Sequence, residues 1–538
     1  MPLDRPVFTQ VPAVLRSVPG VAQVLTPDAL VFLGQLQARF GLRLHALMVA
    51  RARRQSQYDE GRLPNYRDET LDIRRGIWQA EPVPQALMDR RVEIATPVDR
   101  RAMVAALNSG ANVHVADFED MTSPTFANIM AGHLNLLDHR DATLEFDDGS
   151  TTKRLVDRPA LLMMRPRGLH LQEANVLIAG QPVSAALFDF GVNAYHCGRA
   201  LSATGQGPFY YLPKLESLEE ARFWNEVFLF TQDSIGLARG TIKATVLIET
   251  LTAAFEMDEI IWELREHIAG LNCGRWDYVF SYIKTLRNHA AFVLPDRAQL
   301  AMDGGFLAAY GARVVKVGHR RGIHAIGGMA AQVPRSDDSV ANEVALATAR
   351  AERLREVAMG NDGTWVATPD LVPVARAVFD EELRGVHQIS VPRQYFRIEP
   401  EMLLRPHKGR ITEAGLRQNI SVAIEYMACW LSGRGAVPIN NHMEDTSTVE
   451  ICRTQVWQWL RHRAEVAWDD GEIKWLDAAG VGEIVQAEIV AILDRLGPNA
   501  FHRGHYAAAA RIVHDAITAP QLPDFITTEA YALLNALD

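Results

Sequence analysis

Carboxylate side chains lie at or near the ends of several β-like segments of this 538-residue chain. Glu119 and Asp120 follow one segment, Glu249 ends another, and Asp277 lies in a third. If these segments form one barrel, their ends meet at one mouth. Acids gathered there would repel one another unless a cation lay among them, and Mg²⁺ prefers such oxygen ligands. With no His or Cys set at metal-binding spacing to compete, the pattern predicts a magnesium site.

Each of these acids also has a structural explanation. Glu249 could complement the positive end of a following helix, and Asp277 could accept hydrogen bonds from loop N–H groups. Glu119 and Asp120 could lie on a solvated turn. The residues alone leave these alternatives open.

Two arginines, Arg165 and Arg167, lie at the end of another β-like segment. Alternate residues of a strand point to the same face, so Arg165 shares the face of Leu161 and Met163. We expect that face to line the barrel interior, which favours a functional Arg165 over a purely structural ion pair. Arg167 has the same parity and is expected to be its packing or pairing neighbour.

Residues 265–280 read REHIAGLNCGRWDYVF. We interpret this run as a helix that ends at Gly270, a polar loop, and a strand that starts at Trp276 and carries Asp277. Backbone N–H groups around Gly274–Asp277 would suit a small anion beside the metal. His267 is expected to be a core or helix-end histidine, and Cys273 a loop residue.

A second local feature is the loop 438–446, PINNHMEDT, which leads into a helix. Asp445 could cap that helix, or Ser447 could pair with Glu450 in a capping box. From the residues alone, the capping role of Asp445 is favoured over a catalytic one.

Eight β-like segments alternate with helical stretches, which predicts an α/β fold with a closed TIM (β/α)₈ barrel. The predicted strands are 91–97, 112–118, 160–165, 209–214, 243–249, 276–282, 323–329 and 364–368.

The predicted domain boundaries lie where the pattern changes between mainly helical stretches and alternating β-like and helical segments. Residues 1–90 should form an N-terminal helical clasp, with a helix starting at Thr26-Pro27-Asp28 and a solvated basic run at Arg51–Arg54. Residues 91–384 should form the barrel, with a small β-hairpin insertion near 141–158. Residues 385–410 are predicted to be a linker and 411–538 a C-terminal helical plug.

Composition excludes several classes of protein. The chain is 48% hydrophobic and 22% charged, with a net charge of −10 and a pI near 6.0. This argues against nucleic acid or an anionic membrane as the main partner. The four cysteines show no CxxC spacing and are expected to be reduced thiols of a cytoplasmic protein. No apolar run approaches a membrane span, and we expect no signal peptide.

The run 265–280 resembles the signature of the malate synthases, which join acetyl-CoA to glyoxylate in the glyoxylate bypass beside the tricarboxylic acid cycle. Other stretches with the same resemblance, of the isoform A pattern, are RRVEIATPV, VADFED, RPRGLHL, ALFDF, GTIKATVLIET, FSYIKT, GGMAA, GTW and MEDTSTVEICRT. The resemblance covers essentially the whole chain. It implies a helical clasp, a TIM barrel and a helical plug, and a Mg²⁺ cofactor.

The resemblance also implies roles for individual residues. Glu249 and Asp277 match the magnesium ligands, and Glu119 and Asp120 match the acids that hold the metal's water ligands. Arg165 matches the arginine on the glyoxylate aldehyde oxygen. Asp445 matches the catalytic base. The expected substrate contacts are Gly274, Arg275, Trp276, Met443 and Pro369.

The expected reaction is a Claisen-type condensation of acetyl-CoA with glyoxylate, followed by hydrolysis of the thioester to malate and CoA. The alternative is a malyl-CoA or citramalyl-CoA lyase, which shares the barrel acids but typically lacks the plug that carries Asp445. A non-catalytic metal- or CoA-binding protein is the third possibility. In each case the partners are small molecules.

Overall fold

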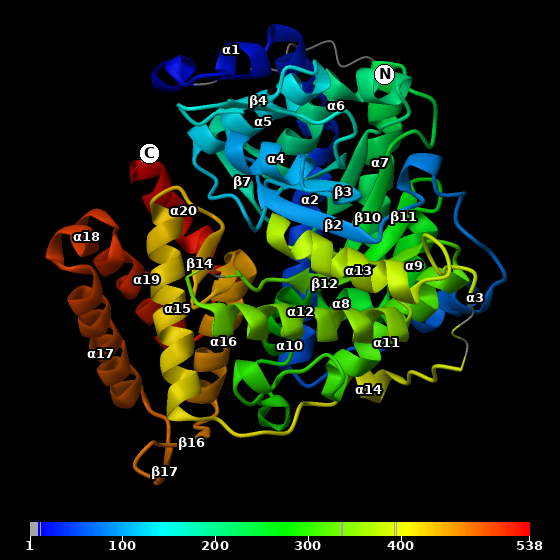
Figure 1. Ribbon diagram of the computed structural model, residues 1–538. Helices are drawn as coiled ribbons and strands as arrows, with labels where there is room; N and C mark the ends of the chain where they lie inside the picture. The colour runs from blue at the N-terminus through cyan, green and yellow to red at the C-terminus, as the bar shows by residue number, and fades with distance from the viewer. Residues whose placement is uncertain (1–8, 11, 335–336, 392, 394, 538) are drawn as a thin grey trace.

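Eight parallel strands close into a barrel in the order in which they occur along the chain. The computed structural model describes all residues except 1–8, 11, 335–336, 392, 394 and 538 (Figure 1). The barrel strands are β2 (Val92–Pro97), β3 (Val113–Asp117), β6 (Leu161–Arg165), β9 (Phe209–Leu212), β10 (Lys243–Ile248), β11 (Ile268–Cys273), β12 (His324–Ala330) and β13 (Gly363–Val366). The predicted TIM barrel is therefore confirmed, and seven of the eight predicted strands overlap an observed one.

The sixth predicted strand is wrong. Residues 276–282 belong to helix α10 (Arg275–Thr285), and the sixth strand is β11, which contains Gly270. A Cβ at Gly270 would lie 2.9 Å from Arg90 Nη1 and 3.1 Å from the His324 carbonyl oxygen. Gly270 thus permits close approach inside the barrel wall and does not end a helix.

Helices surround the barrel and separate its strands (Figure 1). They are α4 (Arg100–Leu107), α5 (Phe126–Arg140), α6 (Ala185–Ala203), α7 (Leu218–Ile235), α8 (Leu251–Phe255), α9 (Met257–Glu263), α10, α11 (Gly305–Arg320), α12 (Ser339–Met359) and α13 (Val372–Glu382).

Two small sheets interrupt this alternation. The predicted hairpin insertion is present as β4 (Glu145–Asp147) and β5 (Thr152–Arg154), which pair antiparallel. A second sheet, which the sequence pattern did not reveal, joins β1 (Thr9–Gln10), β7 (Gln172–Ile178) and β8 (Gln181–Ser184).

The N-terminal region contains α1 (Val21–Val24), the long helix α2 (Pro27–Asp59) and α3 (Leu71–Arg75). Thr26 caps α2 as predicted, because its hydroxyl accepts a hydrogen bond from Ala29 N. Helix α2 buries Leu33, Leu36 and Phe40 against the barrel layer, where it packs on α6.

The C-terminal helices stand together on one side of the barrel (yellow to red in Figure 1) and enclose a separate hydrophobic cluster. They are α15 (Glu413–Leu431), α16 (Thr446–Arg461), α17 (Ala478–Leu496), α18 (Pro498–Arg503), α19 (Tyr506–Thr518) and α20 (Ile526–Leu537). The hairpins β14–β15 (Val437–Ile439, His442–Glu444) and β16–β17 (Glu465–Ala467, Ile473–Trp475) lie between them in the chain.

The described residues of the predicted linker 385–410 include the short helix α14 (Pro400–Leu404), whose Leu403 is buried and which packs on α11. The domain boundaries at residues 90, 384 and 410 stay a prediction. Within the described part of the chain, no helix combines the length and apolar character needed to cross a bilayer.

Candidate active site

The acids predicted at strand ends do meet at one mouth of the barrel. Asp117 ends β3, Glu119 and Asp120 lie in the loop after it, and Glu249 follows β10. Asp277 occupies the first turn of α10, directly after β11, and not the start of a strand. All five side chains are buried.

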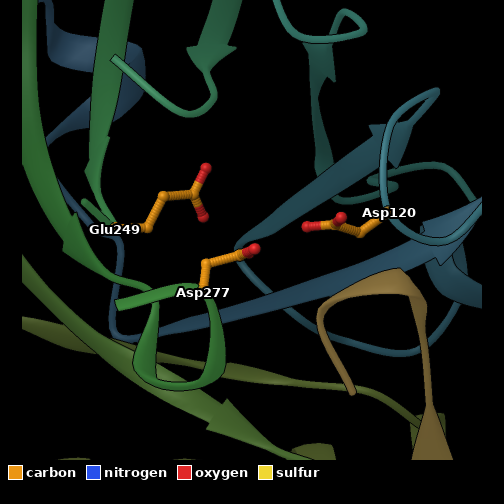
Figure 2. A group of neighbouring side chains, drawn as sticks. All are labelled: Asp120, Glu249 and Asp277. Atoms are coloured by element: carbon orange, nitrogen blue, oxygen red, sulfur yellow. The ribbon is translucent and has the colours of Figure 1, made fainter. Parts of the chain in front are cut away.

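Three of these acids converge on one point (Figure 2). Asp120, Glu249 and Asp277 each offer a carboxylate oxygen, and these oxygens lie within 4.8 Å of one another. Asp277 Oδ1 is buried and accepts no hydrogen bond from the described residues. Buried, incompletely satisfied carboxylate oxygens are the donors that a hard cation such as Mg²⁺ requires, so the residues fit this metal.

Glycine at position 274 makes this convergence possible. A Cβ there would lie 2.7 Å from Glu249 Cβ and 2.8 Å from Glu249 Oε2. The Gly274 N–H donates to the Tyr310 hydroxyl at 3.0 Å and is therefore already engaged. The expectation that it would hold a small anion is weakened for this one N–H group.

Arg165 lies among the acids, as its strand parity predicted. Its Nη2 is 2.7 Å from Asp120 Oδ2, 2.8 Å from Glu119 Oε2 and 3.2 Å from Glu249 Oε1. The Arg165 Nε–H is buried without a hydrogen-bond acceptor among the described residues. Arg165 therefore places a positive charge among the acids and retains an unused donor.

Lys214 is a component of the site to which the sequence pattern gave no role. Its Nζ lies 2.8 Å from Glu119 Oε2, 2.9 Å from Asp120 Oδ1 and 3.3 Å from Asp277 Oδ1. Its backbone N–H donates to Glu249 Oε1 at 2.7 Å. The position of Lys214 just beyond a barrel strand was the signal that could have revealed it.

Burial and neighbouring charges shift the pKa values of these acids in different directions. Burial, with the charge of Asp120, raises the pKa of Glu119 and of Asp277 well above their ordinary values. Burial also acts to raise the pKa of Asp120, but Arg165 and Lys214 outweigh it, and that pKa falls below its ordinary value. Asp120 is thus the acid that the two cations keep ionised.

Asp445 is the N-cap of α16, as the local pattern predicted. Its Oδ1 accepts hydrogen bonds from the Ser447 N–H at 3.0 Å and from the Ser447 hydroxyl at 2.5 Å. Both bonds use one oxygen, which leaves Oδ2 available. Burial first, and then the charge of Asp120, raises the pKa of Asp445 to about 7.

The C-terminal region brings Asp445 to the barrel mouth through backbone contacts. Helix α16 packs on α10, so the helices that begin near Asp445 and Asp277 lie against each other. The Thr446 N–H donates to the Asp120 carbonyl oxygen at 3.1 Å. Tyr426 of α15 contacts the Thr446 hydroxyl at 2.9 Å and donates to the Gly435 carbonyl oxygen at 2.8 Å.

A cavity of about 330 Å³ opens at this junction. Its lining includes Asp120, Arg165, Glu249, Asp277 and Asp445. Four of the predicted substrate-contact residues also line it, namely Gly274, Arg275, Trp276 and Met443.

Two predicted residues do not line this cavity. Pro369 starts the short 3₁₀ helix Pro369–Leu371 and is not part of the cavity lining, so the structure gives it no contact there. Glu119 lines an adjoining small cavity with His170 and Lys214 and stands outside the converging trio.

The remaining predicted neighbours have structural roles. Arg167 forms buried ion pairs with Asp189 and Glu173 at 2.8 and 2.9 Å. His267 is a core histidine, with ring nitrogens that contact Gln232 and Asn225. Thr250, and not Glu249, caps the helix that follows β10.

Family models match three successive parts of the chain. They are the malate synthase N-terminal domain at residues 9–71, the malate synthase TIM barrel domain at residues 161–406, and the malate synthase C-terminal region at residues 410–534.

Proteins named malate synthase match over nearly the whole chain. One from Myxococcus xanthus (strain DK1622) is 47% identical and covers 96% of this chain and 95% of its own. One from Oryza sativa subsp. japonica is 46% identical (96% and 93%), and a glyoxysomal one from Zea mays is 46% identical (96% and 94%).

Among solved structures, the magnesium/glyoxylate complex of Haloferax volcanii malate synthase is 14% identical. It covers 78% of this chain and 98% of its own, with a TM-score of 0.43, a degree of likeness that assigns no residue of the site. The family models and the identity over the full length of the relatives are decisive: the chain belongs to the malate synthase family, whose members join acetyl-CoA to glyoxylate.

Proposed function

We propose that this chain condenses acetyl-CoA with glyoxylate and hydrolyses the resulting thioester to malate and CoA. Asp445 would act as the base, and acids of the barrel mouth would hold the metal. The observation that carries the proposal is the shared cavity. A buried carboxylate with a pKa of about 7 and a converging trio of acids line the same space.

Glu249 and Asp277 would hold Mg²⁺, with Asp120 close enough to bind it directly or through water. Only direct binding would differ from the expected arrangement, in which Glu119 and Asp120 hold the metal's waters. A bound Mg²⁺ supplies a Lewis acid that polarises the carbonyl group of glyoxylate. The N–H groups of the first turn of α10, beyond that of Gly274, have no acceptor within the helix and suit the glyoxylate carboxylate.

Asp445 would remove a proton from the methyl group of acetyl-CoA. A base works best when its pKa is near the working pH, and a pKa of about 7 meets that need. Ser447 fixes the carboxylate through Oδ1, so Oδ2 is the atom that takes the proton.

Arg165 would stabilise the oxygen charge that forms when the methyl group is deprotonated. Its Nε–H is an unused buried donor, and a fixed donor in a site with little water stabilises a developing oxyanion strongly. The new carbon–carbon bond then joins the acetyl methyl carbon to the aldehyde carbon of glyoxylate. Water cleaves the thioester of the product, which releases malate and the CoA thiol.

Arg275, Trp276 and Met443 would contact the acetyl-CoA chain. The Arg275 guanidinium lies 4.2 Å from the Trp276 ring centroid, and both residues line the cavity. Pro369 stays a predicted CoA contact, although it does not line the cavity.

The test is release of free thiol from acetyl-CoA, with and without glyoxylate and Mg²⁺. We expect wild type to require both additions and Asp445→Asn to lose about 10²–10⁴-fold in kcat, the usual contribution of a general base. Asparagine caps a helix as well as aspartate does, so folding should survive.

The matched control is Asp477→Asn, which changes the N-cap of α17 in the same C-terminal region and should keep full activity. No thiol release by wild type, together with cleavage of malyl-CoA to acetyl-CoA and glyoxylate, would support the lyase alternative instead. Binding of CoA or Mg²⁺ with neither reaction would support the non-catalytic alternative.

We also infer a cytoplasmic location, although relatives from plants carry glyoxysomal names. The four cysteines are buried and unpaired, as in a reducing compartment. Fractionation of source cells with an antibody against the chain tests this, and recovery with organelles or membranes would contradict it.

A further inference from the structure

The basic run at Arg51–Arg54 was expected on a solvated stretch of helix, and for Arg51 this is wrong. Its guanidinium binds both carboxylate oxygens of Glu220 at 2.7 Å and lies 3.5 Å from Glu216. Its Nη2 also donates to the carbonyl oxygen of Lys214 at 2.8 Å. The N-terminal helix α2 therefore contacts the backbone of a residue at the barrel mouth.

Lys214 has an unusual backbone that needs such support. Its φ is +52°, in the left-handed region that non-glycine residues seldom occupy. Arg51 holds its carbonyl group on one side, and Glu249 accepts from its N–H on the other at 2.7 Å. A strained conformation persists where surrounding contacts fix it, and it often marks a functional position.

The side chain of Lys214 enters the acid cluster as a result. Its Nζ lies within 3.3 Å of Glu119, Asp120 and Asp277, and the side chain is almost fully buried. Two of these acids belong to the trio that fits a divalent cation. The ammonium group therefore shares the carboxylates of Asp120 and Asp277 with the proposed metal.

The charge balance leaves room for both cations. The mouth gathers five carboxylates, and Arg165 and Lys214 are the two cations that contact them among the described residues. When all five acids are ionised, the formal charges leave a surplus of three negative charges, and a bound divalent cation favours that ionised state. A divalent ion is therefore still attracted while it is repelled at short range by the ammonium group.

We infer that Lys214 is a resident cation that tunes the affinity of the acid cluster for Mg²⁺, and that Arg51 of the N-terminal helix is the positioning residue that holds Lys214 in place. The inference rests on the proposed magnesium site, and it gives the N-terminal helix a part in the active site.

The first test is isothermal titration of the full-length protein with MgCl₂ alone. Removing the ammonium group in Lys214→Met removes the repulsion, so Mg²⁺ should bind at least fivefold more tightly. Lys214→Arg keeps the charge and should stay within twofold of wild type. Unchanged or weaker binding in Lys214→Met would overturn the inference, because a residue that merely organises the acids would lower the affinity when lost.

The second test addresses Arg51. Arg51→Lys keeps a positive charge near Glu220 but loses the fork that reaches the Lys214 carbonyl group. We expect Mg²⁺ to bind about two- to threefold more tightly and kcat to fall, with the KM for acetyl-CoA unchanged. Wild-type values for both would overturn the role of Arg51.

Arg67→Met is the matched control. Arg67 binds both oxygens of Glu219, the residue next to Glu220 on α7, without a contact to Lys214. Its loss should lower thermal stability and leave Mg²⁺ affinity as in wild type. If Lys214→Met does not fold, Lys214→Gln replaces it with the same expected direction.

These titrations are independent of turnover. A chain that binds Mg²⁺ but releases no thiol would contradict the proposed reaction and still measure the effect of Lys214. A chain that turns over normally but shows no change in Lys214→Met would contradict only this inference.

Discussion

Two buried clusters of charge inside the barrel are built on opposite principles. Near the N-terminal end of β2, Arg90 and Glu93 are fully buried and pair at 2.6 Å. Tyr211 and Thr245 complete the hydrogen bonds of Arg90, and Trp365 donates to Glu93 at 2.9 Å. Every charge in this cluster has a partner.

The charges at the mouth of the same barrel are unbalanced. Its acids outnumber its cations, Asp277 Oδ1 accepts no hydrogen bond, and Arg165 Nε–H donates none within the described residues. A balanced buried pair contributes to a unique fold, whereas an unbalanced cluster costs stability until a ligand completes it. Charge balance, more than burial, therefore separates the structural cluster from the functional one.

The largest effect should come from removing acids at the mouth. In Glu249→Gln with Asp277→Asn, kcat should fall by about 10³-fold or more, because two of the proposed metal ligands lose their charge. The metal-free protein should melt at a higher temperature, since repulsion is relieved. Thiol release and calorimetry in EDTA measure both. A lower melting temperature would contradict the inference that repulsion among the acids of the mouth costs stability.

The balanced cluster should respond in the opposite sense. Arg90→Met leaves Glu93 buried and unpaired, so the free energy of unfolding should fall by about 3–5 kcal/mol. Urea denaturation with and without MgCl₂ measures this loss, which should be equal in the two conditions. A loss that Mg²⁺ reverses would show that the two clusters are coupled.

The pH dependence of kcat should report Asp445. The base must be ionised, and its pKa lies at about 7, so the rate should rise with pH and level off above that value. Well below the midpoint, kcat should fall about tenfold for each pH unit. Bound Mg²⁺ favours the carboxylate and moves the midpoint to lower pH. A profile with no acid limb down to pH 5 would contradict Asp445 as the base.

The smallest effect should come from Tyr426→Phe, which removes the hydroxyl that joins α15 to Thr446 and Gly435. Stability should fall by about 0.5–1.5 kcal/mol, and kcat by a few fold as Asp445 loses part of its support. Tyr210→Phe is the control, because this buried tyrosine loses a single bond to Asn193 away from the cavity. Equal kcat values in the two variants would remove Tyr426 from the positioning of the base.

The sequence predicted the barrel well because its strands are short apolar runs between helical stretches. It failed at β11, where Gly270 and Asn272 interrupt the apolar pattern, and at α10, whose aromatic residues favour a strand. Asp277 was nevertheless a predicted metal ligand, because the resemblance that implies this role depends on the residue order and not on the secondary structure.

The site was predictable where residues lie at strand ends, and not where contact comes from distant helices. Arg165 and the acids follow strands that must meet at one mouth. Tyr426 lies inside a helix of the C-terminal region, and nothing in the neighbouring sequence points to its contacts with Thr446 and Gly435. Lys214 occupied a strand end but lacked a local pattern that distinguishes a site lysine from a structural one.

The hairpin β14–β15 reaches the barrel through main-chain groups. The Met443 N–H donates to the Ala331 carbonyl oxygen at 2.7 Å, and the Val333 N–H donates to that of Asn441 at 2.8 Å. Because peptide groups are common to all residues, the exposed His442 and the half-buried Met443 can change without loss of these two bonds, whereas Val437 and Ile439 are buried in the C-terminal cluster. Both His442 and Met443 line the cavity, so an engineer seeking a new acyl substrate should begin at these two positions, where a change of side chain leaves Asp445 in register.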